Sequence, residues 1–131
     1  MTWELAQLVH RYALQVDEGR GVGDLFTEDG ALVVPAPPGL EPTVEHRGRA
    51  AIQAATTGLP MTFHAVVGSV FDGTTGRVAC VAHHVIAPDK DLVWHLRYAD
   101  DYAHVDGTWL IARRALTIDL VEVRPLKQVR H

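Results

Sequence analysis

The chain has 131 residues, of which 47% are hydrophobic and 21% charged, and its formal net charge is −4 at pH 7. This length fits one domain over residues 1–131, and the composition is ordinary for a globular protein rather than a disordered one. The acidic balance leaves no large basic surface for phosphate groups, so we do not expect nucleic acid as a partner.

Compartment is indicated by the cysteine content and by the start of the chain. Cys80 is the only cysteine, which excludes an intramolecular disulfide and fits a reducing compartment, and its apolar neighbours predict a core position. The segment 1–15 lacks a basic n-region and an uninterrupted apolar core, so we do not predict a signal peptide. No apolar run is long enough to span a bilayer. We expect a cytoplasmic protein without a membrane partner.

The first quarter of the chain predicts a helix followed by short elements. A helix over residues 2–18 is indicated by apolar residues at three- and four-residue spacing, and glycines end it. Residues 22–26 are expected to form a second short helix before a turn at 28–30, and residues 31–34 a strand. The helical stripe consists of Leu5, Leu8, Val9, Tyr12, Ala13 and Val16.

The remaining elements predict a long antiparallel meander. A proline-rich loop over residues 35–42 excludes regular structure and is a candidate pocket rim. A short strand over residues 44–47 and an alanine-rich helix over residues 48–57 follow. Helices that precede a meander indicate an α+β domain. The four meander strands are expected near residues 62–72, 77–87, 92–105 and 108–123.

A family resemblance rests on four stretches, which follow in the order LFTEDGALV, HRGRAAIQA, TFHAVVGSVFDG and LRYADDYAHVDGTWLIARR. Over nearly the whole chain they resemble the SnoaL-like branch of the NTF2-like superfamily. The resemblance implies an α+β cone, in which a curved, mixed or antiparallel sheet wraps a long N-terminal helix around an apolar pocket. It also implies a homodimer, because the open side of such a sheet commonly pairs with a second copy.

Several enzyme activities occur on this fold, and the fold by itself does not choose among them. They include scytalone dehydratase, bile acid 7α-dehydratase, limonene epoxide hydrolase, ketosteroid isomerase and polyketide cyclases. NTF2-like domains also serve as noncatalytic ligand-binding or dimerisation modules.

Three residues are candidates for acid–base chemistry, although each also has a structural interpretation. Tyr12 lies on the buried stripe and is either a satisfied core tyrosine or a donor into a cavity. Asp17 is poorly suited to a helix C-terminus, where the partial charge is negative, and is either held by a partner or simply exposed. His64 lies in a strand with two largely apolar faces, where a core histidine is the common case.

The resemblance favours a catalytic role for all three, since Tyr12, Asp17 and His64 match the Tyr/Asp/His set of enzymes like bile acid dehydratase in type and approximate spacing. In that role His64 is the base, Asp17 orients its ring, and Tyr12 is the acid or oxyanion donor. The implied function is cofactor-independent dehydration of an apolar, ring-containing small molecule. Polyketide cyclisation and epoxide hydrolysis in the same pocket are the alternatives.

A second group of candidates lies in the strand expected at 92–105. Alternation places Trp94, Leu96, Tyr98, Asp100 and Tyr102 on one face. An aspartate among aromatic side chains is either a catalytic carboxylate with a raised pKa or the partner of Arg97, Arg113 or Arg114. We assign Asp100 to the catalytic set, and Trp94, Tyr98, Tyr102 and Phe26 to substrate binding. Alternation along the strand does not decide whether this face lines the pocket or the dimer interface.

Eight histidines raise the question of a metal site, which we do not expect. His83 and His84 are adjacent in a strand and point to opposite faces, so they are badly placed to share one ion. We expect His46, His104 and His131 to face solvent. A noncatalytic module remains the alternative class, and it predicts that Tyr12, Asp17 and His64 do not converge.

Overall fold

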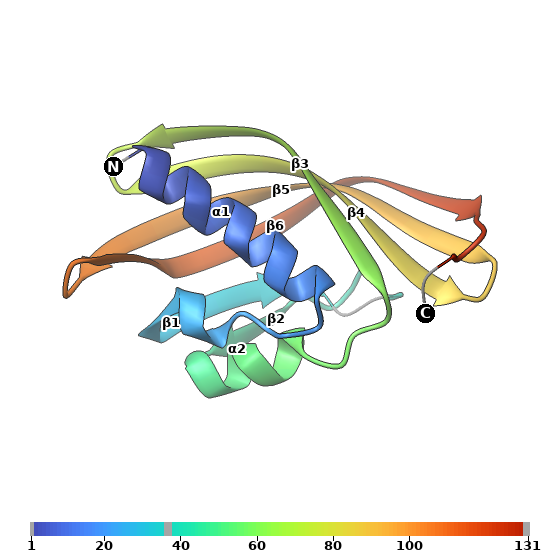
Figure 1. Cartoon of the computed structure of the whole chain (residues 1–131), viewed down its shortest axis with the longest axis horizontal. Helices are drawn as coiled ribbons and strands as arrows, with labels where there is room; N and C mark the ends of the chain where they lie inside the picture. The colour runs from blue at the N-terminus through green and yellow to red at the C-terminus, as the bar shows by residue number, and fades with distance from the viewer. Residues whose placement is uncertain (1, 36–37, 130–131) are drawn as a thin grey trace.

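The computed structural model describes residues 2–35 and 38–129. Within these ranges one long helix, a 3₁₀ turn and a short helix accompany six strands, and Figure 1 shows their arrangement. The elements are α1 (Thr2–Asp17), η1 (Gly23–Leu25), β1 (Phe26–Val34), β2 (Val44–Arg47), α2 (Arg49–Thr56), β3 (Thr62–Asp72), β4 (Thr75–Ala87), β5 (Lys90–Val105) and β6 (Thr108–Pro125).

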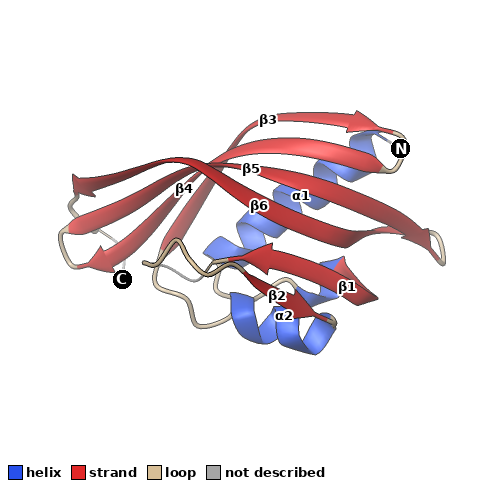
Figure 2. Ribbon diagram, turned by 180° about the vertical axis from the view of Figure 1, so that it is seen from behind, coloured by secondary structure: helices blue, strands red, loops and turns tan. Residues whose placement is uncertain are grey.

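The strands form one curved, mixed sheet in the order β2-β1-β6-β5-β4-β3. The run from β3 to β6 is an antiparallel meander, whereas β1 pairs with β6 in parallel and with β2 antiparallel. The sheet is open, because β2 and β3 are its two edges and do not pair with each other. Figure 2 shows the long strands bending around α1. The predicted α+β cone is thereby confirmed.

The first helix packs its apolar stripe into the core, as the spacing predicts. Leu5, Leu8, Val9, Tyr12 and Val16 are all buried in one cluster with residues of the sheet. The helix ends at Asp17, and the chain turns away through glycines with positive φ. At Gly21 a side chain would also meet Gln53 at 2.5 Å, so this turn requires glycine both for its backbone conformation and for close packing against α2.

The segment after the first helix differs from its prediction. Only Gly23–Leu25 is helical, as a 3₁₀ turn, and β1 already begins at Phe26. The expected turn at 28–30 lies inside β1, where the pairing with β6 shifts register between Phe26 and Ala31. The polar residues there mark an irregularity within a strand rather than its beginning.

The strand β3 has the predicted limits but not the predicted faces. Alternation would place His64, Val66, Gly68 and Val70 together. A register shift between Val66 and Gly68 instead reverses the parity, so that Val70 is 58% exposed while Val66 packs against the core. A bulge of this kind leaves little trace in a pattern of apolar residues.

Two further expectations concern the core and the membrane. Cys80 is buried in the central cluster, as predicted from its apolar neighbours. Among residues 2–35 and 38–129 we find no helix with the length and apolar character needed to cross a bilayer.

Candidate functional site

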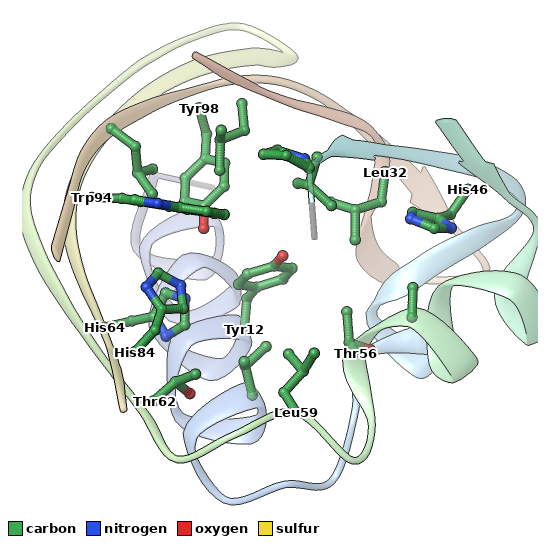
Figure 3. A pocket seen from close by; sticks show the side chains of 16 residues that line it. Tyr12, Leu32, His46, Thr56, Leu59, Thr62, His64, His84, Trp94 and Tyr98 are labelled. Atoms are coloured by element: carbon green, nitrogen blue, oxygen red, sulfur yellow. The ribbon is translucent and has the colours of Figure 1, made fainter. Parts of the chain in front are cut away.

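A mostly apolar cavity of about 170 Å³ opens between α1, the concave face of the sheet and α2 (Figure 3). Aliphatic and aromatic side chains make up most of its wall, with a few polar groups that converge on it. An apolar cavity with few polar groups is typical of small-molecule sites. The lining consists of Tyr12, Val16, Leu32, Val34, Pro35, His46, Ala55, Thr56, Leu59, Thr62, His64, His84, Trp94, Leu96, Tyr98 and Leu116.

The structure brings Asp17 and His64 together at the wall of this cavity. Asp17 is the last residue of α1, and Thr62 and His64 lie on the face of β3 that is turned toward it. One carboxylate oxygen lies 2.7 Å from Nδ1 of His64 and accepts a hydrogen bond of 2.9 Å from the Thr62 hydroxyl. The other oxygen accepts the backbone N–H of His64 at 2.8 Å. Contacts to both its ring and its backbone fix His64 relative to the helix.

These contacts determine the charge of Asp17 and the orientation of the imidazole. Burial alone would raise the pKa of the Asp17 carboxyl, but the hydrogen bonds from the His64 ring and backbone and from Thr62 lower it below its usual value. An ionised carboxylate accepts the proton on Nδ1, which leaves Nε2 of His64 as the basic nitrogen. The arrangement suits an imidazole that accepts a proton from a bound molecule.

Tyr12 lines the same cavity and is 4% exposed. Its ring meets that of Tyr98 edge-on at 5.8 Å, and Figure 3 shows both hydroxyls directed into the cavity. Burial raises the pKa of both phenols, and the charge of Arg114 only partly opposes this. The two tyrosines therefore stay protonated, and their hydroxyls, which interact with each other, are donors in the cavity that His64 also lines.

Asp100 is not on the cavity wall, which corrects its assignment to the catalytic set. Its carboxylate accepts two bonds from the Arg114 guanidinium, at 2.8 and 2.7 Å, and one of 2.7 Å from the Tyr102 hydroxyl. Both oxygens are engaged and buried, so the alternative of a structural ion pair with Arg114 holds. The guanidinium in turn lies over the rings of Tyr12 and Tyr98, at 4.3 and 3.9 Å from their centroids.

The four predicted substrate-binding residues divide into two pairs. Trp94 and Tyr98 line the cavity. Tyr102 does not, because its hydroxyl is bound to Asp100 and its ring packs on Phe71. Phe26 is fully buried in the core beside the Tyr12 ring rather than in the cavity wall. The last two assignments are wrong for the same reason: the residues face inward at places where core side chains fill the space.

Arg97, the first of the three arginines considered as partners of Asp100, does not pair with it. Arg97 lies on the outer face of the sheet and makes a bidentate pair with Asp119, with both bonds at 2.8 Å. Asp100 points to the inner face, so the two do not form a unit. Their separation by three positions in a strand already predicts opposite faces.

His84 is a further polar group of the cavity, which the sequence did not single out. As predicted, it and His83 face opposite sides of β4, and His84 lines the cavity. Its Nδ1–H donates to the Leu92 carbonyl at 2.9 Å, and burial lowers its pKa. Its ring packs at 4.4 Å from that of Trp94, whose indole N–H has no hydrogen-bond partner among the described residues. In the β4–β5 register His84 is opposite Leu92, and Trp94 lies two residues further along β5, so both rings are on the same face of the sheet.

His46 corrects the expectation that it faces solvent. It is paired with Leu32 in the β1–β2 register, and both side chains line the cavity. His104, by contrast, is exposed and stacks on Trp109, as predicted for a solvent-facing residue. His131 lies outside the described residues. Within the described ranges, no group of three or more His, Cys, Asp or Glu side chains is arranged to hold a metal ion.

Solved structures share this fold over most of their length. A provisionally assigned scytalone dehydratase from Novosphingobium aromaticivorans aligns with a TM-score of 0.77 and 21% identity, over 99% of this chain and 93% of that one. A variant of a Mycobacterium tuberculosis protein of unknown function aligns with a TM-score of 0.74 and 26% identity, over 90% and 71%. A hexachlorocyclohexane dehydrochlorinase, LinA type 2, aligns with a TM-score of 0.77 and 11% identity, over 99% and 91%.

The sequence comparisons place the chain in a family. No curated protein matches it. The family model of the SnoaL-like domain matches residues 2–115, which include all of α1, the Asp17–His64 pair and most of the cavity wall. The chain belongs to the SnoaL-like domain family.

Proposed function

We propose that this protein is a cofactor-independent lyase or isomerase that acts on an apolar ring-containing small molecule, with elimination of water as its leading reaction. The observation that carries the proposal is the 2.7 Å contact between Asp17 and Nδ1 of His64 at the wall of an apolar cavity. This contact gives a largely buried imidazole an oriented basic nitrogen, as proton abstraction from carbon requires.

The proposed reaction begins with a proton on the carbon next to a carbonyl group. Nε2 of His64 takes this proton, the electron pair forms an enolate, and the Tyr12 hydroxyl donates a hydrogen bond to the enolate oxygen. The enolate then re-forms the carbonyl and a carbon–carbon double bond as the β-hydroxyl leaves. That hydroxyl takes up the proton from His64 and departs as water, so the enzyme returns to its starting state.

The raised pKa of Tyr12 supports its part in this scheme, since a phenol that stays protonated remains a donor throughout. His84 has a different part. Because its Nδ1–H is held by the Leu92 carbonyl, its Nε2 accepts a hydrogen bond, and we assign it to the leaving hydroxyl of the substrate. Asp17 stabilises the charged imidazolium that forms on His64.

The size of the cavity and the comparisons support the kind of substrate and reaction. A cavity of about 150 Å³ takes up benzene, and this one measures about 170 Å³ and opens to the surface. One ring therefore fits within this volume, and a second ring would extend through the opening. Two proteins of the same fold bear names that denote elimination from a ring compound, a dehydratase and a dehydrochlorinase.

The test measures proton abstraction without knowledge of the natural substrate. We expect the protein to accelerate exchange of the protons next to the carbonyl of 1-tetralone in D₂O, followed by NMR. His64→Asn should slow this exchange by about 10²-fold or more. The matched control is His83→Asn, because His83 is also bonded at 2.7 Å to an aspartate, Asp91, but lies on the other face of the sheet.

A second probe distinguishes dehydration from its alternatives. The ketone 3-hydroxy-1-tetralone loses water to give 1-naphthol, which is readily detected by fluorescence. Formation of naphthol that depends on His64 supports the dehydratase. Exchange without naphthol formation favours an isomerase or cyclase in the same pocket. If neither reaction exceeds that of the His64→Asn variant, the noncatalytic module is the better interpretation.

A further inference from the structure

The wall of the cavity opposite the catalytic pair contains an ionisable side chain that the proposed reaction does not use. His46 lies across the cavity from His64 and His84, as Figure 3 shows. It belongs to β2, and its cross-strand neighbour on β1 is Leu32, a fully buried wall residue. The register thus holds the His46 side chain on the inner face.

The His46 ring has no polar partner in the part of the chain that the structure describes. No hydrogen bond or ion pair joins it to any residue in the described ranges 2–35 and 38–129. Its two neighbours in β2 point the other way: Arg47 and Glu45 pair with each other at 3.0 Å, and Glu45 also pairs with Arg113 at 2.8 Å. His46 is therefore the one ionisable group that the described part of β1, β2 and α2 contributes to the cavity.

Besides the two imidazoles of His64 and His84, whose Nε2 atoms are acceptors, the cavity contains three further donor groups. The phenols of Tyr12 and Tyr98 and the unpaired indole N–H of Trp94 belong to the opposite wall. Among the described lining residues there is no carboxylate, since Asp17 lies behind His64 and Asp100 is held by Arg114. A cavity rich in donors and lacking carboxylates favours a ligand with electron-rich or anionic oxygens.

We propose that His46 is a substrate-recognition residue that binds an anionic oxygen, a carboxylate in the simplest case, on the end of the ring system remote from the reacting carbon. An imidazole suits this role, because it presents an N–H donor in its neutral form and two in its charged form. The proposal rests on the proposed function for the statement that His64 marks the reacting end. It narrows the substrate class to acidic ring compounds.

The test compares two probes of equal shape, 2-naphthoate and its neutral counterpart 2-naphthamide, by isothermal titration calorimetry. Because a hydrogen bond to a charged oxygen is about twice as strong as a neutral one, we expect the wild-type protein to prefer the naphthoate by about tenfold. His46→Leu should abolish this preference and leave binding of the amide within about twofold. His46→Gln, which keeps an N–H donor, should retain part of it. His104→Leu, at an exposed histidine, is the control.

Several outcomes overturn the proposal. The first is an equal affinity of the wild-type protein for both probes, and the second is a preference for naphthoate that survives in His46→Leu. The third is an equal loss of affinity for both probes in His46→Leu, which would indicate that the substitution changes the shape of the cavity. A preference lost in His64→Asn but kept in His46→Leu would assign the anion to the catalytic wall. Because binding is measured without turnover, the two proposals can fail separately. The preference for naphthoate can be absent while proton exchange depends on His64, and proton exchange can be absent while the preference depends on His46.

Discussion

At the scale of single residues, the chain contains two histidine–aspartate pairs of the same length. His64 lies 2.7 Å from Asp17, and His83 lies 2.7 Å from Asp91. The first faces the cavity and the second lies on the other face of the sheet, so the chemistry of an imidazole depends here on what surrounds it rather than on its immediate partner. Residue spacing on the first helix and the family resemblance pointed to Asp17 and His64 as candidates. Alternation along the strand correctly predicted that His83 and His84 face opposite sides of the sheet.

A prediction at this scale concerns Asp17. Its pKa is lowered in the folded protein, so the carboxylate stabilises the fold fully above its unfolded value of about 3.9, and this contribution is lost as the pH falls through the lower folded value. We expect Asp17→Asn to reduce the free energy of unfolding by about 1–3 kcal/mol at pH 7. Urea denaturation from pH 7 to pH 3 should show this difference shrinking below about pH 4. A difference that is constant with pH would contradict the assignment.

At the scale of elements, β5 and β6 are joined by a buried ion pair. Asp100 and Arg114 are directly opposite in the register, and their side chains are 0% and 1% exposed. The guanidinium supports the rings of Tyr12 and Tyr98 from behind, which connects the pair to the cavity. Burial works against the charge on Arg114, but Asp100 more than compensates and raises the pKa of Arg114, so the guanidinium stays charged.

The second prediction follows from this pair. Removing one partner of a buried ion pair leaves an uncompensated charge, whereas replacing both with apolar residues is often close to neutral. We expect Arg114→Met to lower the stability by about 3–5 kcal/mol, and the double variant Asp100→Leu with Arg114→Met to recover much of the loss. Urea denaturation of the two single variants and the double variant measures the coupling. Equal losses in the single and double variants would mean that the charges do not compensate each other.

At the scale of the whole molecule, the outer side of β3 exposes apolar residues at one edge of the sheet. Phe63, Val67 and Val70 are between 58% and 65% exposed. Apolar residues gathered on one surface commonly mark an interface. We propose, in line with the family resemblance, that this region pairs with a second copy to form a homodimer.

The third prediction tests this pairing. Val70→Glu places a charge on the proposed interface but lies far along β3 from His64, so it should halve the molar mass measured by light scattering and leave exchange activity in place. Leu14→Glu, at an exposed position of α1, should not change the mass. A wild-type protein of monomer mass would contradict the proposal directly.

Much of the fold follows from local patterns, because periodicity directly reports which side of an element is buried. The apolar spacing of α1 and the alternation from Trp94 to Tyr102 could be read in this way, and the structure agrees with them. The register shift between Val66 and Gly68 could not, because a single added residue reverses the faces without altering the composition.

The sequence by itself determined the family, the cone and the residues that could form an acid–base pair. Only the tertiary structure decided where the core ends and the cavity begins. Phe26 and Tyr102 are as buried as Tyr12 and Trp94, yet only the latter pair line the cavity, and His46 joins them although it sits in a short polar strand. The physical reason is that burial is a property of one face of one element, whereas an opening depends on whether side chains from several distant elements fill the space between them.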